Sequence, residues 1–316
     1  MVTDFVIPKI QPDELLAGYR GRIASWNGCR STAEVVEAMV ALYPAAGRWA
    51  STTMQFIEAA ALANDLQAET LIRRHSTYVL RAKSHRRELL AVQGNYVLAS
   101  QASMAIYSHT KRIMGCMVCM RADAARLQYS FWRRSHQIPG RLNCPIHASP
   151  LVYAEESLLL PGGPASCERL HPLPAEAAQV GASGAECPDF VVAMLEAMVV
   201  KFRRPEHKAA VAQIRAALKA RGIDASDARD RRSLQAQLLD RFPPAWLAMA
   251  LSTSGVAANK LKNKVARTLH PTIACSAIDL AMVASLAFTD LRSALVTLGL
   301  NEVDAAPAFV SQQLAA

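Results

Sequence analysis

The sequence lacks a long uncharged apolar run and lacks an apolar leader near its start. A helix that spans a bilayer takes about 20 apolar residues in a row, and the longest candidates, residues 190–200 and 280–288, are shorter. Asp4, Lys9 and Asp13 interrupt the apolar core that a secretion signal would need. We therefore expect a cytoplasmic protein with no membrane partner.

Cysteine is also scarce, with seven residues in a chain of 316, and the number is odd. Secreted folds that depend on disulfides are short and dense in cysteine pairs, which this chain is not. The composition fits a reducing compartment, where thiols stay available for metal ions.

Signatures of several enzyme classes are absent as well. The chain has no His-Glu-x-x-His motif, no Gly-x-x-x-x-Gly-Lys phosphate loop and no Gly-x-Ser-x-Gly elbow. Zinc deaminases need a glutamate beside a zinc-binding histidine, and the sequence supplies none. We predict that the protein is not an enzyme, and we keep a zinc-dependent hydrolase as a minor alternative.

The composition describes a basic globular protein. Hydrophobic residues make up 52% of the chain and charged residues 19%, and 316 residues are enough for two or three domains. The net charge of +9 makes a polyanion, above all DNA, the first partner to consider. An arginine-rich surface can also serve only for solubility, so the net charge by itself does not decide whether the protein binds DNA.

The most informative segment is 116–147, which begins and ends with a pair of metal-ligand residues. It opens with Cys116-Met117-Val118-Cys119 and closes with Cys144-Pro145-Ile146-His147. Three thiolates and one imidazole, with no carboxylate, describe a closed structural zinc site. The 24 residues between the pairs slightly exceed the ~15–20 that are usual. Unrelated buried thiols are the alternative, but two pairs of matching spacing favour one Zn²⁺ held by Cys116, Cys119, Cys144 and His147.

Residues 56–75 show the pattern of a helix-turn-helix. Small residues predict a compact helix over 56–63, Asn64 and Asp65 a turn, and residues 68–75 a second helix with a basic end. Arg73 and Arg74 are therefore candidates for DNA contact. Helical hairpins without a DNA partner share this pattern, so plain packing stays open.

Helix boundaries and one further basic segment can also be predicted. Asp13 and Glu14 suit the first turn of a helix that ends at Asn27-Gly28. Between the two ligand pairs, residues 124–137 read as one helix on which Arg133 and Arg134 would contact DNA or a partner. We expect His136 to be a hydrogen-bonded structural residue, because four ligands already complete the site.

The segment around the ligands resembles the TniQ/TnsD family of transposition target-selection proteins. The resemblance rests on the two ligand pairs together with Tyr129, Trp132-Arg133-Arg134, His136-Gln137 and Pro139-Gly140, and on the opening residues 12–16. It implies a non-catalytic adaptor that recognises a target and recruits the transposon AAA+ ATPase. Many members carry a further Cys-x-x-Cys pair after the histidine. Here only Cys167, His171 and Cys187 could replace it, at irregular spacing, so we expect a single zinc.

The C-terminal part reads as helical to its end. Pro243-Pro244 starts a helix over 245–251, residues 252–255 form a turn, and residues 256–269 form a basic helix. This is a second helix-turn-helix candidate, with ordinary amphipathic packing as an equal alternative. Its candidate DNA contacts are Lys260, Lys262, Lys264 and Arg267.

Together these patterns predict a mostly α-helical protein, in which helix-turn-helix-containing helical domains flank a small zinc-ribbon-like module. The predicted parts are an N-terminal domain over 1–112, the zinc module over 113–155, a linker over 156–188 and a C-terminal domain over 189–316. The predicted function is target-site selection in DNA transposition, with a stand-alone zinc-containing DNA-binding regulator as the alternative. The target, whether DNA or an RNA-guided complex, and a homodimeric assembly are left open.

Overall fold

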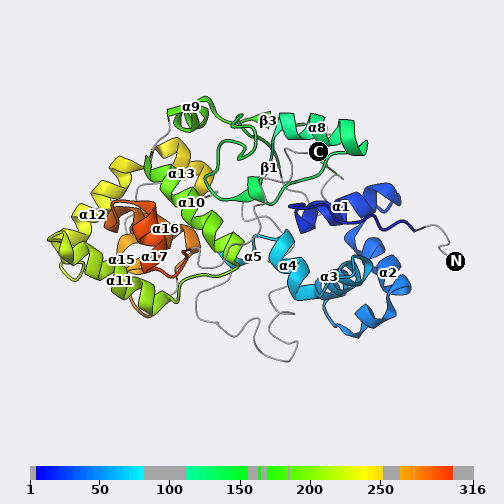
Figure 1. The fold of residues 1–316 in the computed structure, drawn as a ribbon, viewed down its shortest axis with the longest axis horizontal. Coiled ribbons are helices and arrows are strands. Elements are labelled where there is room, and N and C mark those ends of the chain that lie inside the picture. Colours follow the sequence, from blue (N-terminus) through cyan, green and yellow to red (C-terminus); the bar gives the residue numbers. More distant parts are fainter. Residues whose placement is uncertain are drawn as a thin grey trace.

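A computed structural model describes residues 5–81, 112–155, 163–164, 169–183, 186–251, 264–273 and 275–301. It confirms the predicted mostly α-helical fold. Figure 1 shows the N-terminal helices on the right and the C-terminal helices on the left, with the small sheet near the middle of the view and helix α8 above α1.

The N-terminal helices cover residues 16–81. They are α1 (Leu16–Trp26), α2 (Thr32–Leu42), the 3-10 helix η1 (Pro44–Arg48), α3 (Thr52–Ala63), α4 (Ala68–His75) and α5 (Tyr78–Arg81). Asn27 ends α1 as predicted. Asp13 and Glu14 do not lie in the first turn of α1, since the helix begins at Leu16. Asp13 instead has a φ of 61°, and Glu14 forms a β-bridge with Arg133.

The central part combines a three-stranded antiparallel sheet with one helix. Its elements are β1 (Arg112–Gly115), α8 (Met117–Leu127), the 3-10 helix η3 (Ser135–Gln137), β2 (Val152–Glu155) and β3 (His171–Pro172). The strand order is β1-β2-β3, with Ile113 opposite Ala154 and Val152 opposite Pro172. Strand β3 and the following helix α9 (Ala175–Ser183) both fall within the predicted linker.

The predicted helix over 124–137 is wrong. Helix α8 begins seven residues earlier, because the Cys116 side chain accepts from the backbone N–H of Cys119 and caps the helix. It ends at Leu127, where Gln128 takes a left-handed conformation with φ 65°. The chain from 128 to 134 then leaves the helix, which decides where Arg133 and Arg134 point.

The C-terminal helices surround one apolar helix. They are α10 (Glu186–Lys201), α11 (His207–Ala220), α12 (Ala228–Arg241), α13 (Pro244–Ala250), α15 (Lys264–Thr268), α16 (Ala277–Ala287) and α17 (Leu291–Thr297). Every residue of α16 except the half-buried Asp279 is buried, and the helix packs against α10, α11, α12 and α15. Among the described helices none is alone long and apolar enough to cross a membrane, and α16 with α17 reaches that length only across a 119° bend.

Buried side chains form two cores, and the central part contributes to both. The N-terminal core gathers α1 to α4 and includes Trp132 from the loop after α8. The C-terminal core gathers α10 to α17 and includes Cys116, Cys119 and Cys144. The central part therefore packs against both helical groups.

Candidate metal centre and the helix pair beside it

Four side chains meet at the start of α8. The ligand atoms of Cys116, Cys119, Cys144 and His147 all lie within 4.8 Å of one another. The Nδ1 atom of His147 is 3.7 Å from Cys116 Sγ, 3.3 Å from Cys119 Sγ and 3.6 Å from Cys144 Sγ. The Sγ atoms of Cys119 and Cys144 are 3.7 Å apart. The predicted ligand set is thus brought together and could hold a metal ion.

The distances and the donor types fit a tetrahedral ion of zinc-like size. Zinc binds sulfur at about 2.3 Å and nitrogen at about 2.0–2.1 Å, so tetrahedral edges are about 3.8 Å between sulfurs and about 3.6 Å between sulfur and nitrogen. The observed separations are close to these values. The three cysteines are buried and His147 is exposed, so the ring of His147 covers the cluster on the solvent side.

The surroundings of the cluster favour thiolates. Backbone N–H groups of Cys119 and Ile146 point at Cys116 Sγ and Cys144 Sγ, at 3.5 Å and 3.4 Å. The hydrogen bond that Cys144 accepts from Cys119 lowers the pKa of Cys144, and the same bond raises the pKa of Cys119. Hydrogen bonding to the charged form is what stabilises a thiolate here.

Arg133 lies inside the protein, contrary to the predicted surface contact. Its guanidinium donates to the Asp123 carboxylate at 2.7 Å, and both side chains are almost fully buried. The guanidinium also lies 4.4 Å from the centre of the Phe131 ring. Because α8 ends before this residue, Arg133 turns back onto the inner face of the helix. It is a packing residue of the central part and is inaccessible to DNA.

Arg134 joins the central part to α4. Its guanidinium donates to the backbone oxygen of Arg73 at 2.8 Å and lies 3.5 Å from the Asp13 carboxylate. Asp13 in turn accepts from the Ser135 hydroxyl at 2.6 Å and receives the backbone N–H of Arg134 at 2.7 Å on its carbonyl. The Arg134 side chain is mostly buried by these contacts, so the structure places it at a joint and not on an open surface.

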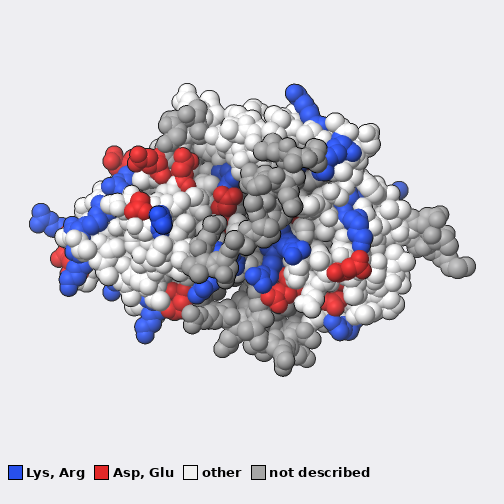
Figure 2. Space-filling model, in the orientation of Figure 1, with Lys and Arg blue, Asp and Glu red and all other residues white. Residues whose placement is uncertain are grey.

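The helix pair α3 and α4 has the predicted layout. Helix α3 ends at Ala63, Asp65 takes a left-handed φ of 56°, and α4 begins at Ala68. Leu66 is half-buried against the N-terminal core. Arg73 and Arg74 are both exposed near the end of α4, and Figure 2 shows Lys and Arg gathered near α4 in the middle of this face. Arg73 also lies 5.7 Å from the Phe202 ring.

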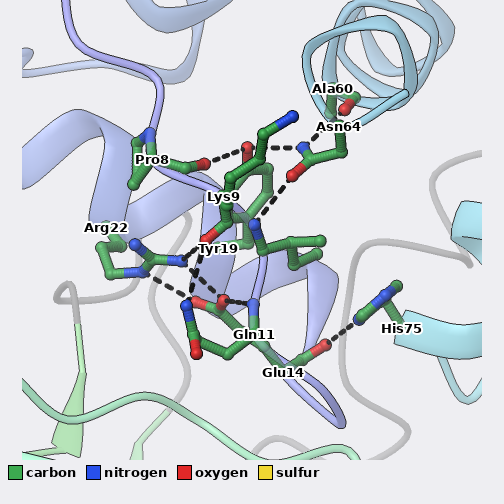
Figure 3. Close-up of polar contacts among 10 residues, drawn as sticks. Pro8, Lys9, Gln11, Glu14, Tyr19, Arg22, Ala60, Asn64 and His75 are labelled. Carbon is green, nitrogen blue, oxygen red and sulfur yellow. Dashed lines mark hydrogen bonds and ion pairs between the residues drawn. The ribbon is translucent and has the colours of Figure 1, made fainter. Parts of the chain in front are cut away.

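A buried ion pair holds the segment before α1 in place. Figure 3 shows Arg22 reaching back to Glu14 with two hydrogen bonds, of 2.9 Å and 2.7 Å, and His75 meeting the Glu14 carbonyl at 2.9 Å. Both charged side chains are essentially inaccessible to solvent. Burial raises the pKa of Glu14, while the partner Arg22 opposes that shift. Sequence reasoning missed this pair, although an Arg eight residues after the Glu was visible.

The second helix-turn-helix candidate lies only partly within the described residues. Helices α13 and α15 are present, and Arg267 is exposed on α15. Lys264 is the first residue of α15, while Lys260, Lys262 and the turn lie outside the described residues. Helix α15 packs on α12 and α16. The DNA contacts of this part stay predictions.

Fold and site define a helical protein with a Cys₃His cluster that could hold a metal ion, and Arg134 in the same central part donates a hydrogen bond to helix α4. The family model described as TniQ matches residues 5–151, which include α1 to α5 and all four candidate ligands. No curated protein matches the chain. Through this N-terminal segment, a little under half of its length, the chain is similar to the TniQ family, which is related to target selection in transposition.

Proposed function

We propose that the protein is a non-catalytic adaptor that recognises a transposition target and recruits the AAA+ ATPase of the transposon. The carrying observation is the TniQ match, since it spans both the helix pair and the metal cluster. The cluster holds one structural Zn²⁺, because four ligands leave no position for a substrate or a catalytic water. The zinc therefore stabilises a surface, and recognition is left to the helices around it.

The target-binding surface is centred on α4. Arg73 and Arg74 are exposed on this helix, and arginine suits contact with phosphate oxygens. The backbone of Arg73 is held by Arg134, so the end of α4 is fixed relative to the metal cluster. Preorganised cations of this kind favour binding to a polyanion, whether it is duplex DNA or a complex that contains RNA. Arg133 and Arg134 support α4 and do not contact the target.

The outer face of α8 is the proposed docking face for the ATPase. Met117 and Val118 are 39% and 42% exposed, and Ile146 in the second ligand pair is 49% exposed. Arg121 and Arg126 are exposed on the same helix, whose one acid, Asp123, is buried. Apolar side chains beside arginines are typical of protein interfaces and depleted from surfaces that serve only for solubility. This face therefore suits an acidic, partly apolar protein surface.

Pull-down of the purified partner ATPase, with and without duplex DNA, tests the proposal. The wild-type protein should retain the ATPase, and the double variant Arg121→Glu with Arg126→Glu should retain much less. The control is Arg232→Glu, a single charge reversal of the same kind on the exposed side of α12 in the C-terminal part. A wild-type protein that never binds the ATPase but does bind DNA would favour a stand-alone regulator.

Titration of labelled duplex DNA at rising salt tests the target-binding surface. Each phosphate contact contributes a slope of about −0.9 in the logarithm of the affinity against that of salt. Arg73→Glu with Arg74→Glu should weaken binding and flatten this slope, while Arg232→Glu should change neither. Binding that is insensitive to salt, or unchanged in the double variant, would contradict a DNA target at α4.

A further inference from the structure

Two histidines approach the thiol cluster, and they approach it differently. His147 Nδ1 lies within 3.7 Å of all three sulfurs. His136 Nε2 lies 3.4 Å from Cys144 Sγ and 3.9 Å from Cys119 Sγ. His136 is 1% exposed. His147 thus completes a four-ligand set. His136 contacts only two of the three sulfurs, those of Cys119 and Cys144.

A divalent ion at this site would leave a charge to be stabilised. Three thiolates and a neutral imidazole around a doubly charged cation carry a net charge of −1. The three cysteines are almost fully buried, and a buried charge costs free energy unless hydrogen bonds satisfy it. Two groups can stabilise a charge on Cys116: its Sγ atom lies 3.2 Å from Ser149 Oγ, and it accepts from the backbone N–H of Cys119. The edge between Cys119 and Cys144 is the one that His136 faces.

We propose that His136 donates a hydrogen bond from Nε2–H to the Cys144 thiolate, and so positions and stabilises the metal site without being a ligand. The other ring nitrogen, Nδ1, is buried and has no hydrogen-bond partner among the described residues. A proton on Nδ1 would therefore be a buried donor without an acceptor, which is costly. A proton on Nε2 instead points at sulfur.

The backbone on both sides of His136 is held in place for this role. The Gln137 side chain accepts from the N–H of Met114 at 2.9 Å and donates to its carbonyl at 2.8 Å, which ties η3 to β1. It also donates to the carbonyl of Arg133 at 2.9 Å. Fixed neighbours of a metal ligand orient it and tune its affinity, and their loss typically weakens binding about 10-fold to 100-fold.

The first experiment measures zinc affinity of the full chain by competition with a chromophoric chelator. His136→Phe keeps a ring of similar size but no donor, and it should bind zinc about 10-fold to 100-fold more weakly. His136→Gln keeps an N–H donor and should recover much of the loss. Equal affinity of His136→Phe and wild type would overturn the proposal. The inference rests on the proposed zinc site, whose own failure would show as a wild-type protein that binds no zinc.

Cobalt substitution separates a donor from a ligand. With Co²⁺, His136→Phe should keep the intense visible bands of four-coordinate cobalt and shift the sulfur-to-metal charge-transfer band, whereas His147→Phe should lose the four-coordinate spectrum. The reverse result would make His136 the ligand and overturn the proposal.

A measurement on the wild-type protein does not depend on any variant folding. Nitrogen-15 spectra of histidine-labelled, zinc-loaded protein report which ring nitrogen carries the proton. We expect the proton of His136 on Nε2. A proton on Nδ1 with a bare Nε2 would contradict the inference.

Discussion

The guanidinium of Arg134 donates a 2.8 Å hydrogen bond to the backbone oxygen of Arg73. Since Arg134 follows α8 and Arg73 lies in the last turn of α4, this bond connects the part of the chain with the candidate metal cluster to the proposed target-binding helix. The last carbonyl groups of a helix have no hydrogen-bond partner within the helix, and the bond from Arg134 satisfies one of them, that of Arg73. The cation itself is favourable there, at the negative end of the helix dipole.

Arg134→Met should therefore loosen α4 without unfolding the protein. The variant keeps much of the side-chain volume and removes the bond to Arg73 and the contact with Asp13. We expect faster amide hydrogen exchange in α4 and unchanged exchange in α16, which lies in the other core. Equal acceleration in both helices would indicate global destabilisation instead of a local joint.

Replacing a proposed zinc ligand should remove both metal and fold. Wild-type protein should contain about one zinc per chain by elemental analysis, and Cys144→Ser should lose the metal and most of the soluble protein, because structural metal binding is folding free energy. Cys29→Ser is the control, since Cys29 is a half-buried thiol outside the cluster. Well-folded, metal-free Cys144→Ser protein would refute a structural zinc.

Glu14→Gln should be strongly destabilising. The amide keeps the shape of the carboxylate but leaves Arg22 buried without a counter-charge, and breaking a buried pair typically costs 3–5 kcal/mol. Asp65→Asn breaks the exposed pair with Lys9, which is 2.8 Å long, and should cost less than about 1 kcal/mol. Chemical denaturation of both variants measures the difference, and similar losses would contradict the role assigned to Arg22.

Acid should destabilise the protein through His75. Burial lowers the pKa of His75 to about 4, while in the unfolded chain it stays near 6.5. Between these values the unfolded state binds more protons than the folded state. The free energy of unfolding is therefore unaffected by His75 above about pH 6.5 and decreases as the pH falls toward 4. The slope reaches about 1.4 kcal/mol per pH unit.

His75→Gln provides the comparison. An amide N–H can still reach the Glu14 carbonyl, but it takes up no proton in this range. The difference in unfolding free energy between wild type and His75→Gln should therefore change with pH between about 6.5 and 4. Release of metal at low pH would affect wild type and His75→Gln equally, so it cancels in the difference between their unfolding free energies. A difference that does not vary with pH would mean that folding does not lower the pKa of His75.

Gly18→Ala tests the contact between α1 and the loop after α8. An added Cβ at Gly18 would lie 3.0 Å from Cβ and Cδ1 of Trp132, whose side chain is fully buried and cannot move aside. We expect a loss of about 1–3 kcal/mol. Trp132→Phe removes part of the crowding, so the double variant should lose less than the sum of the two single losses. Additive losses would show that Gly18 and Trp132 do not interact.

Local patterns were sufficient for several features. Asn27 predicts the end of α1, and the turn at Asn64 and Asp65 together with short-range spacing predicts the ends of α3 and α4. The two-residue spacing within each ligand pair predicts the four ligands. These signals span only a few residues, so the backbone itself enforces them. The start of α8 was missed because a cysteine that caps a helix resembles an ordinary ligand in the sequence.

The sequence by itself determined the mostly helical class, the ligand set and the family resemblance. Only the tertiary structure decided that Arg133 is buried against Asp123, that Arg134 and Asp13 form a joint with α4, and that His136 faces the cluster from inside. Asp13 and Ser135 are 122 residues apart and Arg73 and Arg134 are 61 apart. Contacts of this range depend on how two cores pack around one module, and burial then decides whether an arginine meets solvent or a carboxylate.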